Sequence, residues 1–181
     1  MHELIGMIAR WRPVHLGHAA VLHGLCDAAA QVRIGIGSAN RYNARNPFTM
    51  DETRNMIDLV LCGRTNYEVI AVNDLDDGPR WREQVRDLFG PLDAFVTDNP
   101  YVTQLMREVY PIIRPITLVA PDKQLPIDGT QVRQAMARGG DWQRLVPAPV
   151  AEYIRANKLD ERFCREFGLQ TLAMGLLNLD T

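Results

Sequence analysis

Short apolar segments alternate with longer helix-like segments along most of this 181-residue chain. Runs typical of strands occupy residues 4–9, 32–37, 67–72, 94–97 and 112–119, the last broken by Pro115. Helical patterns occupy residues 18–30, 50–61, 80–88, 101–109, 131–138 and 149–157. Because parallel strands need a crossover element between them, this alternation predicts an α/β fold. We expect a Rossmann-like, doubly wound parallel sheet of about five strands, flanked by helices.

Capping residues mark several of the predicted helix ends. Thr49 and Glu52 have the spacing of a capping box before the helix at 50–61. Thr130 is expected to cap the helix at 131–138, and Gly139-Gly140 to end it. Ligands of such sheets bind beyond the carboxyl ends of the strands, so the loops of interest are 10–17, 37–49, 73–80 and 98–101.

We expect one compact domain over residues 1–158 and a helical C-terminal extension over residues 159–181. An apolar run at 167–179 looks helical and could pack on the domain or at an oligomer interface. We expect a homo-oligomer.

Composition narrows the class of protein. The 20 Lys and Arg against 22 Asp and Glu leave a net charge of −2, so no basic field indicates a nucleic-acid partner. Three widely separated cysteines, Cys26, Cys62 and Cys164, favour neither a disulfide framework nor a zinc site. Neither a signal-like N-terminus nor an apolar run of membrane-spanning length occurs, so we expect a cytoplasmic protein that does not bind membranes.

The first predicted strand leads directly into a loop rich in anion-binding groups, Arg10-Trp11-Arg12-Pro13-Val14-His15-Leu16-Gly17-His18. At a helix start, free N–H groups and the positive end of the helix dipole favour anions. Gly17 lets a phosphate approach the backbone, and the two histidines add donors. The pattern H-x-G-H between strand and helix therefore indicates a phosphate site. The alternative is that His15 fills a turn and His18 caps the helix.

A second candidate block stands at another predicted helix start, Ile127-Asp128-Gly129-Thr130-Gln131-Val132-Arg133. Gly129 and Thr130 would present backbone and hydroxyl donors to a triphosphate, and Arg133 follows one helical turn later. The alternative is an ordinary N-cap at Thr130 and a solvated helix face at Arg133.

These blocks resemble the archaeal-type nicotinamide-nucleotide adenylyltransferases, within the larger class that carries the H-x-G-H signature. The resemblance covers most of residues 4–157. Besides the two blocks, it rests on Gly35-Ile36-Gly37-Ser38-Ala39, Arg45-Asn46-Pro47-Phe48-Thr49, Asp74 followed by Trp81, Thr97-Asp98-Asn99, and Gly140-Asp141-Trp142. It implies an enzyme of NAD biosynthesis that joins nicotinamide mononucleotide (NMN) to the AMP moiety of ATP and releases pyrophosphate.

The resemblance also implies roles for individual residues. The catalytic groups would be His15, His18, Arg10 and Arg133, with Mg²⁺ accompanying ATP as substrate. ATP would contact Ala9, Arg10, Pro13, His15, Gly17, His18, Asp128, Gly129, Thr130 and Arg133. NMN would contact Ser38, Arg45, Asn46, Phe48, Asp74, Trp81 and Asn99.

Within the NMN set, Trp81 and Phe48 are implied to lie near the nicotinamide ring and Asp74 near its amide, while Ser38 and Arg45 would lie near phosphates. An indole face suits a cationic pyridinium. Core packing is the alternative for Trp81. For Asp74 and the nearby Asp76 and Asp77, the alternative is a solvated loop.

The chain departs from the family's pattern at four positions. It has Ala9 for a usual glycine, Arg12 for a usual glutamine, Thr53 for a common arginine and Asp128 for a usual serine. A carboxylate at 128 would repel a triphosphate, unless Mg²⁺ lies between them or the side chain turns away to cap the helix.

Two other functions stay open at this point. One is a related H-x-G-H transferase with another phosphorylated acceptor, against which the Asp74 and Trp81 pair argues. The other is a non-catalytic nucleotide-binding protein, against which both histidines and Arg133 argue.

Overall fold

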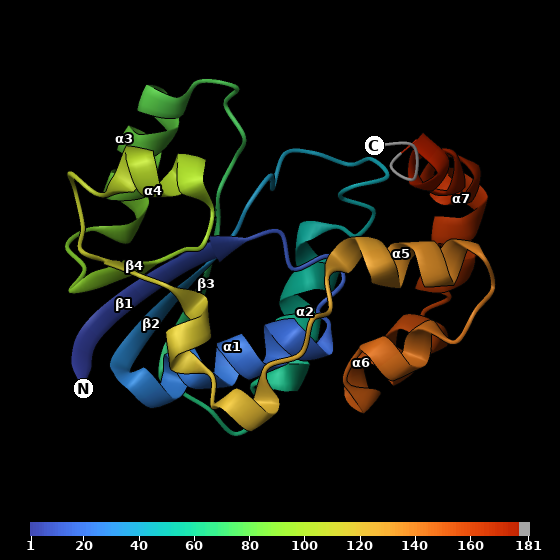
Figure 1. The fold of residues 1–181 in the computed structure, drawn as a ribbon, viewed down its shortest axis with the longest axis horizontal. Coiled ribbons are helices and arrows are strands. Elements are labelled where there is room, and N and C mark those ends of the chain that lie inside the picture. The colour runs from blue at the N-terminus through green and yellow to red at the C-terminus, as the bar shows by residue number, and fades with distance from the viewer. Residues whose placement is uncertain (178–181) are drawn as a thin grey trace. The chain divides into compact units, whose positions relative to one another are not determined.

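The computed structural model describes residues 1–177 of the chain (Figure 1). Its strands are β1 (His2–Ala9), β2 (Ala29–Ile36), β3 (Tyr67–Ala71), β4 (Ala94–Val96) and β5 (Ile112–Ile113). Its α-helices are α1 (Leu16–Ala28), α2 (Met50–Val60), α3 (Gly78–Phe89), α4 (Pro100–Met106), α5 (Gly129–Ala137), α6 (Ala148–Ala156) and α7 (Leu159–Leu177). All strand pairs are parallel, in the order β3-β2-β1-β4-β5. The predicted α/β fold with a five-stranded parallel sheet is confirmed.

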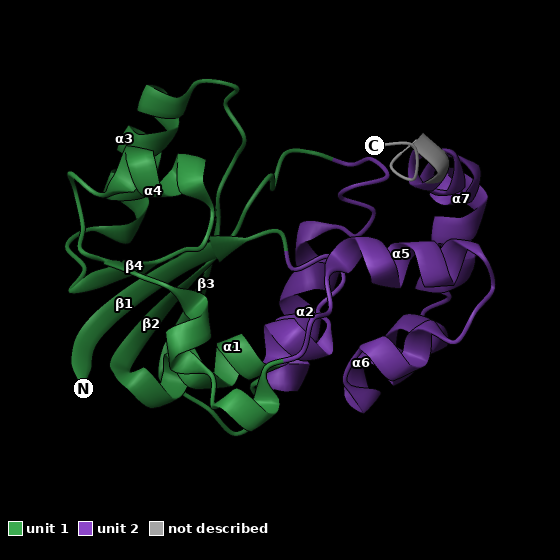
Figure 2. Ribbon diagram, viewed as in Figure 1, with its two compact units in different colours: residues 1–10, 20–41, 61–124 green, residues 11–19, 42–60, 125–181 purple. Residues whose placement is uncertain are grey.

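The chain divides into two compact units (Figure 2). The first, here the sheet unit, comprises residues 1–10, 20–41 and 61–124 and contains all five strands. The second, here the helical unit, comprises residues 11–19, 42–60 and 125–181, of which 178–181 lie outside the described residues. Each unit draws on three separate stretches of sequence, so long-range packing defines both.

The sheet unit has helices on both faces of its sheet, with α3 and α4 on one side and α1 on the other (Figure 1). Val85 and Phe89 of α3, Phe95 of β4 and Met106 of α4 are completely buried in one apolar cluster. This burial removes several large apolar side chains from water, which is the main force that holds helices on a sheet.

Strand register aligns the ends of three adjacent strands. Ala9 at the end of β1 pairs with Ile36 at the end of β2, and Ile36 pairs with Ala71 at the end of β3. The chain therefore leaves these three strands at a common edge, where ligands of open parallel sheets bind.

The helical unit is built from α2, α5, α6 and α7. Helix α7 packs against α5 and α6, and α2 packs against α6. The predicted helical extension is thus confirmed over Leu159–Leu177, whereas positions 178–179 of the predicted apolar run lie outside the described residues. The division of the chain at residue 158 stays a prediction. No helix within residues 1–177 combines the length and the apolar character needed to cross a membrane.

Several predicted boundaries were wrong, each for a physical reason. The first helix ends at Ala28 and not at residue 30, because Ala29 already pairs with His2 of β1 and this pairing overrides alanine's helix preference. The fifth strand is only Ile112–Ile113, and a 3₁₀ helix, η1 (Pro115–Leu118), replaces its second half, since proline cannot donate to a ladder. Two further 3₁₀ helices, η2 (Pro121–Lys123) and η3 (Trp142–Leu145), were not predicted.

Two helical glycines should respond in opposite ways to replacement by alanine. A Cβ on Gly24 of α1 would lie 2.2 Å from the carbonyl oxygen of Leu118, whereas a Cβ on Gly168 of α7 would meet only Cys164 Cβ, at 3.9 Å. We expect Gly24→Ala to destabilise the protein by about 1–3 kcal/mol. We expect Gly168→Ala to stabilise it by about 0.5–1 kcal/mol, because alanine loses less backbone entropy in a helix. Urea denaturation measures both, and effects of equal sign would contradict the packing described.

Candidate active site

The H-x-G-H loop brings its two histidines into direct contact. The chain turns at Trp11, which has a left-handed φ of 55°, and then passes through a cis Arg12–Pro13 peptide bond. The imidazoles of His15 and His18 stack with centroids 3.5 Å apart and an interplanar angle of 21°, and the buried Trp11 indole meets His18 edge-on at 4.8 Å. The two stacked rings are called the histidine pair below.

One hydrogen bond fixes the tautomer of His15. The backbone N–H of His18 donates to His15 Nδ1 at 3.2 Å. A nitrogen that accepts carries no proton, so the neutral ring bears its proton on Nε2 and can donate from there.

Burial keeps the histidine pair uncharged. It lowers the pKa of His15 from 6.5 to about 4, although the Asp128 carboxylate opposes the shift. Burial likewise lowers the pKa of His18 well below its ordinary value, and the adjacent His15 adds to the effect. Both rings are therefore uncharged at neutral pH.

The helix α5 begins with a capping box that uses Asp128. The Asp128 carboxylate accepts from the backbone N–H of Gln131 at 2.8 Å, and the Gln131 side-chain oxygen accepts from the Asp128 N–H at 3.0 Å. The predicted cap at Thr130 was therefore wrong, since the helix starts one residue before it. Gly139 follows this helix with a left-handed φ of 66°, as a terminating glycine should. Of the outcomes considered for Asp128, the structure shows the cap.

Arg133 joins α5 to the H-x-G-H loop. Its Nη1 donates to the carbonyl oxygen of Arg12 at 2.9 Å, and its Nη2 donates to Thr130 Oγ1 at 3.3 Å. A Cβ on Gly129 would lie 2.8 Å from Arg133 Nη1, so a larger residue there would make the guanidinium shift. Arg133 is half-buried and bridges two backbone segments, so the solvated helix face considered for it was wrong.

Two of the departures from the family's pattern meet each other. The buried Arg12 donates from Nε to Thr53 Oγ1 at 3.3 Å, and the Thr53 hydroxyl donates to the Thr49 carbonyl oxygen at 2.7 Å. An arginine at position 53 would lack the hydroxyl acceptor that Arg12 Nε uses and would place a second cation beside it. The two departures are thus complementary. Arg12 supplies the cation from the H-x-G-H loop, and Thr53 supplies a short hydroxyl acceptor from α2.

Asp74 and Trp81 line one hollow of the sheet unit, with a volume of about 170 Å³. Trp81 also packs partly against the apolar cluster under α3, so the core role considered for it is half right. Asn40 fixes the backbone of Asp74, donating to its carbonyl oxygen at 2.9 Å and accepting from its N–H at 2.8 Å. Arg41 pairs with Asp74 at 3.9 Å and also with Asp76. Asp74 and Asp76 thus have an ion-pair partner, while Asp76 and Asp77 are exposed to solvent, as the solvated-loop alternative expects.

Other residues predicted from the resemblance occupy the ends of the strands. Ala9 ends β1 and the exposed Arg10 follows it. Ser38 follows β2 with a left-handed φ of 51°. Asn99 follows β4 and caps α4, its side chain accepting from the N–H groups of Tyr101 and Val102.

The remaining predicted acceptor residues belong to the helical unit. Arg45 is exposed, whereas Asn46 is 4% exposed and Phe48 is fully buried. Asn43 Oδ1 accepts from Asn46 Nδ2 at 3.1 Å, while Asn46 Oδ1 is buried without a hydrogen-bond partner among the described residues. A buried acceptor without a partner costs free energy, so Asn46 Oδ1 is an unusual feature of this segment.

Sequence reasoning missed one aromatic side chain near Trp81. Tyr101 is 59% exposed and lines the same hollow as Asp74 and Trp81. The signal was present, because Tyr101 closes the loop after β4, at the carboxyl end of a central strand.

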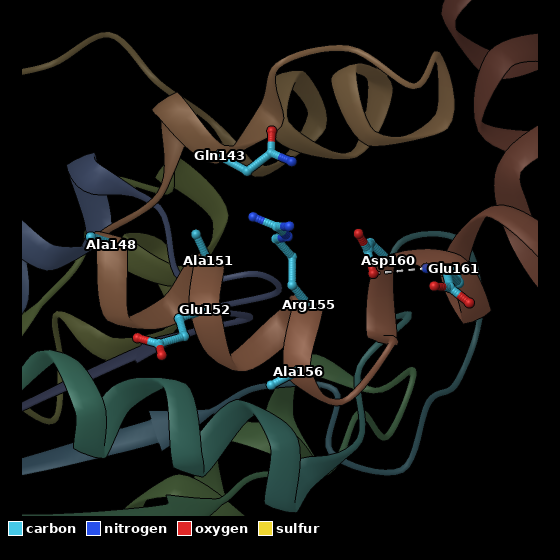
Figure 3. A pocket seen from close by; sticks show the side chains of 8 residues that line it. All are labelled: Gln143, Ala148, Ala151, Glu152, Arg155, Ala156, Asp160 and Glu161. Atoms are coloured by element: carbon cyan, nitrogen blue, oxygen red, sulfur yellow. Dashed lines mark hydrogen bonds between the residues drawn. The ribbon is translucent and has the colours of Figure 1, made fainter.

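A second hollow, of about 640 Å³, lies in the helical unit between η3, α6 and the start of α7 (Figure 3). Its lining is Gln143, Ala148, Ala151, Glu152, Arg155, Ala156, Asp160 and Glu161. None of the predicted site residues contributes to it.

Comparison with known proteins decides the family. No family model matches the sequence. The chain is 31% identical over 166 residues to the nicotinamide-nucleotide adenylyltransferase of Methanococcus vannielii, covering 86% of this chain and 94% of that protein. It is 34% identical over 169 residues to the same enzyme of Methanoculleus marisnigri, covering 89% and 95%. The chain belongs to the nicotinamide-nucleotide adenylyltransferase family.

A solved structure supports the adenylyltransferase fold independently. The chain matches a bifunctional NMN adenylyltransferase/ADP ribose pyrophosphatase from Francisella tularensis, complexed with AMP and a Mn ion, with a TM-score of 0.74 and 18% identity. The match covers 100% of this chain but 57% of that one, so the chain spans just over half of the bifunctional protein. At this identity the likeness concerns the fold.

The buried His15 makes folding of this adenylyltransferase sensitive to acid. The unfolded chain binds a proton on His15 near pH 6.5, but the folded protein binds it only near pH 4, so the free energy of unfolding falls as pH falls through this window. In His15→Asn, the amide oxygen can still accept from the His18 N–H. Between pH 7 and pH 5 we expect the wild type to lose about 2 kcal/mol more than this variant. Urea denaturation at both pH values tests this, and equal losses would show that His15 titrates normally.

Proposed function

We propose that this chain catalyses the attack of the NMN 5′-phosphate on the α-phosphorus of ATP, in line with the departing pyrophosphate. One P–O bond forms to the NMN phosphate and the bond to pyrophosphate breaks, which gives NAD. The attacking phosphate is already an anion, so the reaction requires no general base. Catalysis can then consist of positioning and charge stabilisation.

The observation that carries this proposal is the joined phosphate-binding cluster of the helical unit. It comprises the neutral histidine pair, the N-terminal turn of α5 and the Arg133 bridge. His15 would donate from Nε2 to a phosphate oxygen, and His18 would donate beside it. Arg133, with Arg10, would stabilise the charge that develops on the transferred group. Pro13, Gly17, Gly129 and Thr130 would shape the ATP contact, together with Ala9 and Asp128.

For the acceptor, we propose that Trp81 and Asp74 receive the nicotinamide. The shared hollow supports this, because an indole face and a carboxylate suit a cationic ring that carries an amide. Arg45 and Ser38 would contact phosphate. The unsatisfied Asn46 Oδ1 supports a polar contact to the same substrate, next to Phe48. Asn99 would contribute from the end of β4.

A divalent metal belongs to this reaction with ATP, and we propose Mg²⁺. When bound to ATP it neutralises phosphate charge and polarises the reacting phosphoryl group. We further propose a cytoplasmic location and a homo-oligomeric state.

An acceptor panel tests the activity. Pyrophosphate release from ATP and Mg²⁺ is measured with NMN, with other phosphorylated acceptors and without an acceptor. We expect release and NAD formation with NMN. Release only with another acceptor would assign the chain to a related transferase, and ATP binding without any turnover would identify a nucleotide-binding protein.

Removal of His18 should abolish most of the turnover. His18→Ala deletes a preorganised donor to the phosphates, so we expect kcat to fall by at least about a hundredfold. Circular dichroism and the melting temperature serve as the folding control. Near wild-type kinetics in a folded variant would remove His18 from the catalytic set.

Replacement of Trp81 should weaken NMN binding selectively. In Trp81→Ala we expect a loss of about 1–2 kcal/mol in NMN binding, with the ATP dissociation constant unchanged. Calorimetry with each substrate separates the two effects. Because Trp81 also packs on the core, the melting temperature is measured as well. A loss of stability without selective loss of NMN affinity would leave Trp81 a core residue only.

A further inference from the structure

Helix α7 makes a hydrogen bond to the middle of the acceptor segment, a name used for residues 45–48. Arg162 of α7 donates from Nη2 to the carbonyl oxygen of Pro47 at 3.1 Å. Pro47 stands between Asn46 and Phe48, two residues proposed to contact NMN. A cation on the last helix therefore restrains the backbone between two of the proposed NMN contacts.

The same arginine is held rigidly by a carboxylate. Its Nη1 and Nη2 bond the two Glu52 carboxylate oxygens at 2.6 and 2.7 Å. The side chains of Arg162 and Glu52 are only 22% and 16% exposed. A bidentate, largely buried pair fixes the plane of the guanidinium, whereas an exposed ion pair would be mobile and weak.

Glu52 carries the restraint to the end of the segment. One of its oxygens also accepts from the backbone N–H of Thr49 at 2.8 Å, and the Thr49 hydroxyl accepts from the Glu52 N–H at 3.2 Å. This capping box, which the sequence predicted, starts α2 directly after Phe48. The Glu52 carboxylate thus caps the start of α2 and also pairs with Arg162 of α7.

A second attachment lies on the N-terminal side of the segment. The Tyr42 hydroxyl donates to the Glu166 carboxylate at 2.6 Å, and the Tyr42 ring meets Phe167 edge-on with centroids 5.2 Å apart. The Arg162 guanidinium lies 5.9 Å from the centroid of the Tyr42 ring, within cation–π range. Helix α7 thus contacts residue 42, the carbonyl of residue 47 and, through Glu52, residue 49.

We propose that Arg162 is a positioning residue for the acceptor nucleotide. It lies on α7 and sets the backbone of the acceptor segment, so that Arg45, Asn46 and Phe48 meet NMN in one prearranged geometry. This inference rests on the proposed function, because it assumes that the acceptor segment binds NMN. A prearranged segment binds without first paying the entropy of ordering, so release of the restraint should weaken acceptor binding and leave ATP binding unchanged.

Arg162→Met tests the proposal, because methionine keeps an apolar stem and removes the fork of donors. We expect the KM for NMN and its dissociation constant to rise about tenfold, with the KM for ATP within about twofold of wild type. Arg162→Lys should give an intermediate rise, since an ammonium cannot bond both Glu52 oxygens and Pro47 in the same way. Arg155→Met is the matched control, an exposed arginine of α6 outside the acceptor segment, and should change neither constant.

A purely structural role for Arg162 would give a different result. The melting temperature would fall, while both KM values stayed at wild type or rose alike, and either pattern overturns the proposal. If Arg162→Met does not fold, Tyr42→Phe replaces it. That variant keeps the ring on Phe167 and loses only the bond to Glu166, and we expect the KM for NMN to rise about twofold to threefold. If neither Tyr42→Phe nor Arg162→Lys raises the KM for NMN, the proposal is overturned.

Measurements on the wild-type protein distinguish a failure of the proposed activity from a failure of the positioning role. If the wild type binds NMN but forms no NAD, the proposed activity fails, and the dissociation constants of the variants still test the positioning role. If the wild type forms NAD and Arg162→Met does so with an unchanged KM for NMN, only the positioning role fails. If the wild type binds no NMN, both fail.

Discussion

The hydrogen bond from Arg133 to the carbonyl oxygen of Arg12 joins two segments 121 residues apart, and the proposed phosphate-binding cluster depends on it. Two glycines make the approach possible. A Cβ at position 129 would strike the Arg133 guanidinium, and a Cβ at Gly17 would lie 3.3 Å from the carbonyl oxygen of Ile127. The H-x-G-H loop and the start of α5 therefore act as one piece, with histidine donors on one side and a guanidinium on the other.

The fold was readable from the sequence because its signals are local. Strand and helix periods differ, and parallel strands leave few other topologies once the elements alternate. The predicted helix and strand boundaries were wrong where contacts between distant segments determine the secondary structure. Alanines at 29 and 30 favour a helix, yet both lie in β2, where Ala29 pairs with His2 of β1. Similarly, both Asp128 and Thr130 are good N-cap residues, and the match of Asp128 to Gln131 decided between them.

The site was predictable only in part. Residue types at strand ends pointed to His15, His18, Asp74 and Trp81, because loops of parallel sheets carry function and the family's motifs name these positions. No local pattern could reveal that Arg162 contacts Glu52 across 110 residues of chain. Nor could it show that Arg12 meets Thr53, although each departs from the family's pattern in a complementary way. Such pairs form only when distant segments pack together, and a single sequence does not show which segments do so.

The uncharged state of the histidine pair bears on competition among ligands. A cell contains orthophosphate, carboxylates and many nucleotides, and a permanently cationic pocket would retain all of them by charge alone. Two neutral imidazoles stacked 3.5 Å apart offer directed N–H groups without a net charge of their own. In the proposed reaction, they would bind a ligand whose oxygens lie along their hydrogen-bond directions and would bind a simple anion only weakly. In that reaction, burial of the rings would favour selective binding over general attraction of anions, and it would leave less positive charge to retain the departing pyrophosphate.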